Sequence, residues 1–190
     1  MELFHGTSKS RGDIIVEEGK ISCHAKLMYE DGGEDVLQSA EFSNGLIKPT
    51  TLATTPGYIY LTNSIFKAAY YGNINAVSGN EDSFYLFKVE LPETLLEPDE
   101  DEIRIALCQD PGQYPRAIDS LSACHSARYN RDIITFEYCV LPSTTNFSDP
   151  LRELVMNMIL QRPRPRESNM RQLSMDLLNQ FHSKIEWTKG

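Results

Sequence analysis

The sequence predicts a single domain that contains both α-helices and β-strands. Two segments, 83–91 (SFYLFKVEL) and 132–141 (DIITFEYCVL), have the length of strands and are rich in β-branched and aromatic residues. Around them lie segments with helix-capping residues and with apolar residues at helical spacing. A chain of 190 residues is long enough for one domain with a sizeable core.

The chain opens with a short apolar segment (LFH), which we expect to be a buried strand that ends at His5. A helix is predicted next, capped by Ser8 or Ser10 and ended by Gly19. The segment 29–56 shows no strong period and holds several turn residues, so we expect a loop-rich insertion. Long loops in compact domains often have a function.

In the middle of the chain, segment 57–62 (GYIYLT) opens with a turn signal and continues with strand-forming residues. Asn63 or Ser64 is expected to cap a helix that Gly72 closes. The acidic run 97–102 (EPDEDE) is typical of a solvated loop.

The late strand 132–141 has an alternating pattern that places four side chains on one face. They are Ile133, Thr135, Glu137 and Cys139. After Pro142 the pattern changes to two amphipathic helices joined by a stiff basic hinge (RPRPR). We therefore expect a catalytic domain over 1–142 and a helical extension over 143–190 that packs on it.

Charge and composition exclude several classes of protein. The net charge of −9 and the pI near 4.9 argue against broad electrostatic capture of nucleic acid. No apolar run could span a membrane and no signal peptide is visible, so we expect a cytoplasmic protein, which can also be one delivered into a host or target cell. The four cysteines are expected to be reduced, and the adjacent Cys-His pairs lack zinc-ligand spacing, so no metal is expected.

Three segments carry residues that could do chemistry: 5–7 (HGT), 57–72 (GYIYLTNSIFKAAYYG) and 136–138 (FEY). Singly, each has an ordinary structural explanation. A histidine at a strand end is usually structural, and a tyrosine in an apolar strand usually belongs to the core. The carboxylate of Glu137 is more unusual, because a carboxylate in an apolar strand must be paired or face water.

In this order the three segments resemble the His-Tyr-Glu branch of the ADP-ribosyltransferases, which contains diphtheria-type toxins and poly-ADP-ribose polymerases. The resemblance covers roughly residues 3–141, and the middle segment is its most specific part. It implies an α+β fold with two packed antiparallel sheets around an NAD cleft, to which the C-terminal helices are added.

The resemblance also implies a role for each matching residue. His5, Tyr60 and Glu137 would be the catalytic trio, with His5 on a ribose hydroxyl of NAD and Glu137 on the hydroxyl of the nicotinamide ribose. Gly6 would offer its backbone N–H and C=O to the nicotinamide carboxamide. Tyr60 and Tyr71 would sandwich the nicotinamide ring.

Two further positions are expected at the NAD site. Thr7 completes the His-Gly-Thr motif, and Ala68 stands where the polymerases carry a serine that contacts the nicotinamide amide. One contact to the ring is therefore lost or supplied from elsewhere. The chemistry suits such a site, since aromatic faces attract the pyridinium cation and a fixed carboxylate stabilises an oxocarbenium-like transition state. This reaction requires no metal.

The function that the resemblance implies is transfer of a single ADP-ribose from NAD to a protein or nucleic acid, with release of nicotinamide. Toxins or effectors of this kind can have an inhibitor or antitoxin protein as partner. NAD hydrolysis, inactive binding of NAD or ADP-ribose, and a relation to RNA 2′-phosphotransferases are the alternatives. We expect loops 29–56 and 127–131 to choose the acceptor, unless Arg128 and Arg131 pair with the acidic residues of the chain.

Overall fold

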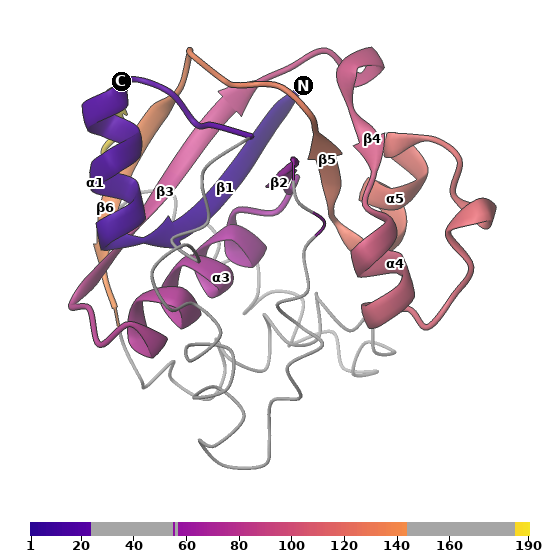
Figure 1. Ribbon diagram of the computed structural model, residues 1–190, viewed down its shortest axis with the longest axis horizontal. Helices are drawn as coiled ribbons and strands as arrows, with labels where there is room; N and C mark the ends of the chain where they lie inside the picture. The colour runs from indigo at the N-terminus through magenta and orange to yellow at the C-terminus, as the bar shows by residue number, and fades with distance from the viewer. Residues whose placement is uncertain (24–54, 56, 144–184) are drawn as a thin grey trace, which may run out of the picture.

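The computed structural model describes residues 1–23, 55, 57–143 and 185–190 (Figure 1). In this part of the chain, helices are mixed with strands that pair antiparallel in two sheets. This agrees with the α+β expectation at a coarse level. Most of the expected loop-rich segment and both expected C-terminal helices lie outside the described residues, in 24–54 and 144–184.

The larger sheet has four strands in the order β1, β3, β6 and β7. They span Glu2–Ser8, Ser83–Glu90, Glu137–Pro142 and Thr188–Lys189. Strand β3 confirms the predicted strand 83–91 to within one residue. Because β7 pairs with β6, the end of the expected helical extension is a strand in this sheet.

The smaller sheet has three strands in the order β2, β5 and β4, which span Ile59–Leu61, Ala127–Tyr129 and Glu97–Pro98. A single bridge joins it to the larger sheet, since the N–H groups of Phe4 and Thr62 donate to each other's carbonyl oxygens at 2.7 and 2.9 Å. The strands therefore follow one another as β4-β5-β2-β1-β3-β6-β7.

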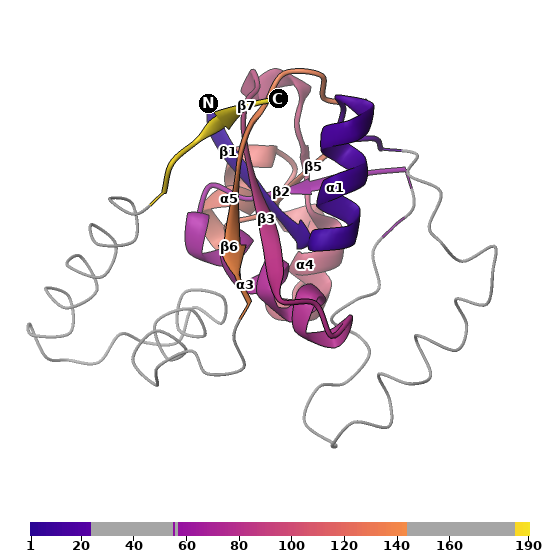
Figure 2. The ribbon, with the colours of Figure 1, turned by 90° about the vertical axis from the view of Figure 1, so that its left-hand side faces the viewer.

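Two helices cover opposite faces of the larger sheet (Figure 2). Helix α1 (Lys9–Glu18) ends at Gly19, whose φ of 65° is the left-handed conformation expected of a helix-closing glycine. Helix α3 (Ile65–Ser78) is capped by Ser64, whose hydroxyl accepts a hydrogen bond from the backbone of Lys67. The remaining helical segments are α4 (Glu100–Ala106), α5 (Ala117–Cys124) and the 3-10 turns η3 (Glu93–Leu95) and η4 (Pro111–Gln113).

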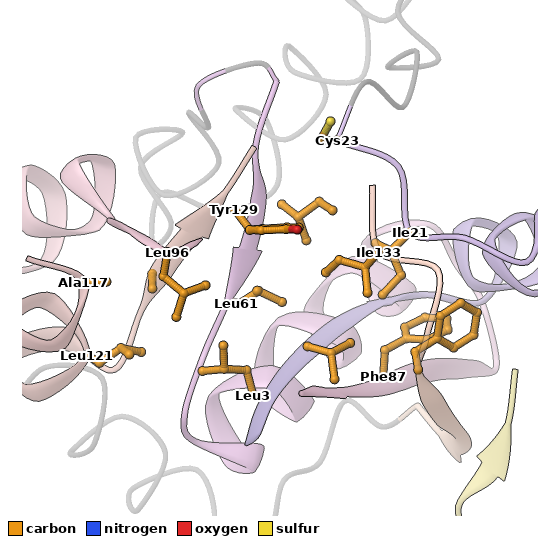
Figure 3. Close-up of a cluster of buried hydrophobic side chains, with 14 of the residues drawn as sticks. Leu3, Ile21, Cys23, Leu61, Phe87, Leu96, Ala117, Leu121, Tyr129 and Ile133 are labelled. Atoms are coloured by element: carbon orange, nitrogen blue, oxygen red, sulfur yellow. The ribbon is translucent and has the colours of Figure 1, made fainter. Parts of the chain in front are cut away.

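The described residues form two hydrophobic clusters, one on each face of the larger sheet. The first cluster joins the two sheets with α5 and the apolar side of α1 (Figure 3). It includes Leu3, Leu61, Phe87, Leu121 and Tyr129. The second cluster packs α3 against the opposite face of the sheet. It includes Phe4, Phe66, Phe84, Leu86 and Cys139.

The structure corrects the predicted end of the helix after segment 57–62. Gly72 does not close α3, which continues to Ser78. A Cβ at Gly72 would lie 2.6 Å from the ring of Phe84, so this glycine lets the helix pack closely on β3. Its role is therefore tertiary packing, which a local end signal does not reveal.

The predicted strand 132–141 is also shorter in the structure. Strand β6 begins at Glu137, and Ile133 makes only an isolated bridge with Ile21. Ile133 belongs to the first hydrophobic cluster, Cys139 to the second, and Thr135 is exposed. The prediction that these four side chains share one face is wrong, because the strand that would define this face begins only at Glu137.

Candidate functional site

Beyond the single bridge between Phe4 and Thr62, the described residues of β1 and β2 share no further backbone hydrogen bond, and we call this unpaired stretch of the two strands the notch. The N–H and C=O of Phe4 point toward β2, so those of Gly6, two residues along β1, point the same way. Within the described residues, no backbone hydrogen bond joins Gly6 to β2. One donor and one acceptor of Gly6 therefore face the notch.

The side chain of His5 makes a hydrogen bond where the next backbone hydrogen bond of the β1–β2 ladder would be. Its Nδ1 lies 2.9 Å from the carbonyl oxygen of Tyr60, so the neutral ring carries its proton on Nδ1 and keeps Nε2 as an acceptor. Burial lowers the pKa of His5, while the hydrogen bond to Tyr60 opposes that shift. The structure thus brings the imidazole of His5 and the backbone groups of Gly6 and Tyr60 together at the notch.

Gly6 also contacts α3 more closely than any other residue type could. A Cβ at this position would lie 1.8 Å from the carbonyl oxygen of Ala68 and 3.0 Å from the backbone nitrogen of Gly72. Ala68 is buried beneath β1, and Thr7 is buried on the face of β1 that His5 shares. Close packing of helix on strand is therefore a second requirement for glycine in the His-Gly-Thr motif.

The hydroxyl of Tyr60 is held by α4. Ile59 and Leu61 are buried in the first cluster, so the side chain of Tyr60 leaves β2 on the other face. Its hydroxyl donates to the carboxylate of Asp101, and the backbone N–H of Thr55 donates to the same hydroxyl at 2.7 Å. Burial and the neighbouring carboxylate raise the pKa of Tyr60, so the hydroxyl stays protonated.

The hydroxyl of Tyr71, on α3, contacts Glu102, which follows Asp101 in α4. It lies 3.5 Å from the carboxylate of Glu102, which accepts a 2.6 Å bond from the buried ammonium of Lys67. Lys67 also donates to the carbonyl oxygen of Cys124 at 2.7 Å, and its ammonium lies 5.9 Å from the centre of the Tyr71 ring. Both tyrosine hydroxyls therefore contact adjacent carboxylates of α4.

Helix α4 corrects the expectation of a solvated loop over 97–102. The side chain of Asp99 caps the helix by accepting from the N–H of Glu102, and Asp99 is 2% exposed. The spacing of Asp99 and Glu102 is that of a helix start, a signal that the sequence reasoning did not use. Lys67, Asp101 and Glu102 are thus the polar residues that sequence reasoning missed near the tyrosines.

Arg128 lies opposite Tyr60 in the smaller sheet, where it is 5% exposed. Its guanidinium is 3.4 Å from Glu100 and 4.0 Å from Asp101, and it stacks 4.4 Å from the ring centre of Tyr58. Of the two roles predicted for Arg128, choice of the acceptor or pairing with acidic residues of the chain, the structure confirms the pairing. Arg131 is exposed.

Glu137 lies away from this group of residues. It is the first residue of β6, which β3 separates from β1, so it stands roughly 10 Å from β1 at ordinary strand spacing. Its partner across β3 is Lys88, whereas the partner of His5 is Phe87. Since Lys88 and Phe87 are consecutive, the side chains of His5 and Glu137 leave the sheet on opposite faces.

The carboxylate of Glu137 has its own environment. It forms an ion pair with Lys88, whose ammonium also lies 4.8 Å from the ring centre of Trp187. The ring centres of Trp187 and Phe4 are 6.2 Å apart, and Lys189 of β7 is the strand partner of Glu137. The structure therefore brings His5 and Gly6 to the backbone of Tyr60, places the hydroxyls of Tyr60 and Tyr71 at adjacent residues of α4, and leaves Glu137 beside β7.

No family model, curated protein or solved structure matches the chain. Within the described residues, His, Cys, Asp and Glu side chains do not gather in a group of three that could hold a metal ion. Among the helices that the structure describes, none is both long and apolar enough to cross a membrane.

Proposed function

We propose that the chain binds NAD at the notch between β1 and β2 and transfers ADP-ribose from it to a protein or nucleic acid. The observation that carries this proposal is the pair of backbone groups of Gly6 that face the notch, next to His5 and Tyr60. A carboxamide presents one C=O and one NH₂ side by side. It therefore complements the adjacent N–H and C=O of one extended residue.

The aromatic and acidic residues around the notch suit the cationic ring of NAD. Tyr60 and Tyr71 offer ring faces, which attract a pyridinium cation by up to ~2 kcal/mol in a desolvated site. Asp101 and Glu102 place negative charge beside both tyrosines. Negative charge at that place also stabilises the sugar cation that forms as nicotinamide leaves.

The catalytic role of Glu137 stays a prediction from the resemblance. Its position on β6, paired with Lys88, is a specific observation that favours a second candidate function, namely binding of NAD or ADP-ribose without transfer. The two candidates differ in one product. Transfer and hydrolysis release nicotinamide, whereas binding alone does not.

The test uses the purified chain and two labels on NAD, one on the nicotinamide and one on the adenylate. We expect nicotinamide release, together with adenylate label that appears in protein, RNA or DNA of an added lysate. Nicotinamide release with the adenylate label only in small molecules would indicate hydrolysis. Saturable binding of NAD without nicotinamide release would support the second candidate, and the absence of NAD binding would contradict both.

Matched histidine variants locate the site. His5→Asn removes the imidazole at the notch, whereas His125→Asn removes one at the end of α5. Asparagine tolerates the left-handed backbone of His125, so the control should fold normally. We expect His5→Asn alone to weaken NAD binding. An equal effect of both variants would place NAD elsewhere.

A further inference from the structure

We infer that Asp101 is a positioning residue of the site, which fixes the ring of Tyr60 through the hydroxyl and so makes α4 part of the NAD-binding apparatus. This inference rests on the proposed function. It concerns a residue in the acidic segment 97–102, to which sequence reasoning assigned no role.

The carboxylate of Asp101 is the centre of a small polar network. One oxygen accepts from the Tyr60 hydroxyl and from the backbone N–H of Thr55 at 3.0 Å, and the other accepts from the Thr55 hydroxyl at 3.0 Å. Arg128 stands 4.0 Å away on the neighbouring strand. Burial acts to raise the pKa of Asp101, but these hydrogen bonds outweigh it and leave the pKa below its usual value.

This network acts on the free end of the Tyr60 side chain. Strand β2 fixes only the backbone of Tyr60, and its ring could still turn about the side-chain bonds. A hydrogen bond from the hydroxyl to an ionised acceptor holds the ring in one orientation. A ring already held in the stacking orientation binds its ligand more tightly, because less side-chain entropy is lost on binding.

The neighbouring carboxylate of Glu102 has a different task and serves as an internal contrast. It pairs with Lys67, which is 3% exposed, so Glu102 chiefly keeps a buried charge neutralised. Loss of Glu102 should therefore lower the stability of the whole fold. Asp101 has a partly exposed partner in Tyr60, so its loss should affect NAD binding more than stability.

The test is a double-mutant cycle on Asp101 and Tyr60, read by NAD titration and by denaturation. Asp101→Asn removes the charged acceptor, and Tyr60→Phe removes the donor while it keeps the ring. We expect each variant to weaken NAD binding about tenfold. The double variant should bind NAD no more weakly than Tyr60→Phe alone, because Asp101→Asn acts on the hydrogen bond that Tyr60→Phe already removes. Asp119→Asn, at the surface pair with Arg116, is the control that should leave NAD binding unchanged.

Several results would overturn the inference. Unchanged NAD binding in Asp101→Asn would show that Tyr60 needs no support, and additive losses in the double variant would show that Asp101 acts by another route. If Asp101→Asn does not fold, Tyr60→Phe alone decides the question, because it removes the hydrogen bond but leaves the carboxylate. Full NAD affinity in Tyr60→Phe would then refute the inference.

A second measurement separates this inference from the proposed function. The carboxylate of Asp101 accepts from the Tyr60 hydroxyl, so Asp101→Asn should shift the NMR resonances of the labelled Tyr60 ring at neutral pH without any NAD present. If the wild-type protein binds no NAD, the proposed function fails and positioning for NAD fails with it. The NMR spectrum would then still show whether Asp101 holds Tyr60. Unchanged Tyr60 ring resonances in Asp101→Asn would overturn the contact itself.

Discussion

Replacing Gly6 with alanine tests the contact on which the notch depends. The added Cβ would lie 1.8 Å from the carbonyl oxygen of Ala68 and 2.6 Å from its carbon. These are backbone atoms in the interior of α3, so no side chain can turn away to make room. Strand and helix would have to separate by roughly 1.5 Å to reach van der Waals contact.

The expected cost follows from this collision. Overpacking of a core typically costs about 1–3 kcal/mol, and a clash with backbone belongs at the upper end, so we expect about 3 kcal/mol for Gly6→Ala. For a chain of 190 residues this corresponds to a fall in Tm of roughly 6–12 °C. NAD affinity should fall as well, because the displaced helix carries Tyr71.

Gly19→Ala is the matched control. Gly19 has a φ of 65°, and a Cβ added there would meet no atom within 4 Å, so alanine experiences backbone strain of about 1 kcal/mol but no collision. Urea denaturation of the two variants measures the difference. If Gly6→Ala is as stable as Gly19→Ala or more so, α3 does not pack on β1 as closely as described, and the reasoning is refuted.

Three further predictions address the chemistry and the acid stability. We expect Glu137→Gln to leave NAD binding unchanged, because Glu137 pairs with Lys88 away from the notch. Nicotinamide release tests its chemistry separately, and a drop of at least about a hundredfold would assign Glu137 the catalytic role that the resemblance implies. Tyr71→Ala should weaken NAD binding in a titration more than Tyr71→Phe does, since stacking needs the ring, and equal large losses would contradict stacking. The N–H of Cys23 and then Lys20 lower the pKa of Asp132 to about 2, so its stabilising effect is present above the usual aspartate pKa and is lost as the pH falls through 2. The difference in Tm between Asp132→Asn and wild type should therefore be larger at pH 7 than at pH 2, and a constant difference would exclude this origin.

Local patterns were sufficient for several elements of the fold. The length and the strand-forming residues of segment 83–91 predicted β3, and the capping residue Ser64 predicted the start of α3. Gly19 likewise marked the end of α1. These features depend on interactions within a few residues, such as hydrogen bonds of the backbone to a nearby cap, which the sequence displays directly.

The composition of the site required the tertiary structure. His5 and Tyr60 meet because one bridge joins β1 to β2, and Asp101 reaches Tyr60 from a helix forty-one positions along the chain. Sequence order placed Glu137 with them, whereas strand order and register placed it on β6 beside Lys88.

The physical reason lies in what each kind of information specifies. Side-chain alternation assigns a residue to one of two faces of its own strand, but the face that meets a neighbour depends on the register between strands. In the same way, the sequence shows that 99–102 can start a helix, but only packing decides which side chains its carboxylates reach. The sequence by itself therefore determined several of the elements, and the tertiary structure decided which side chains lie together.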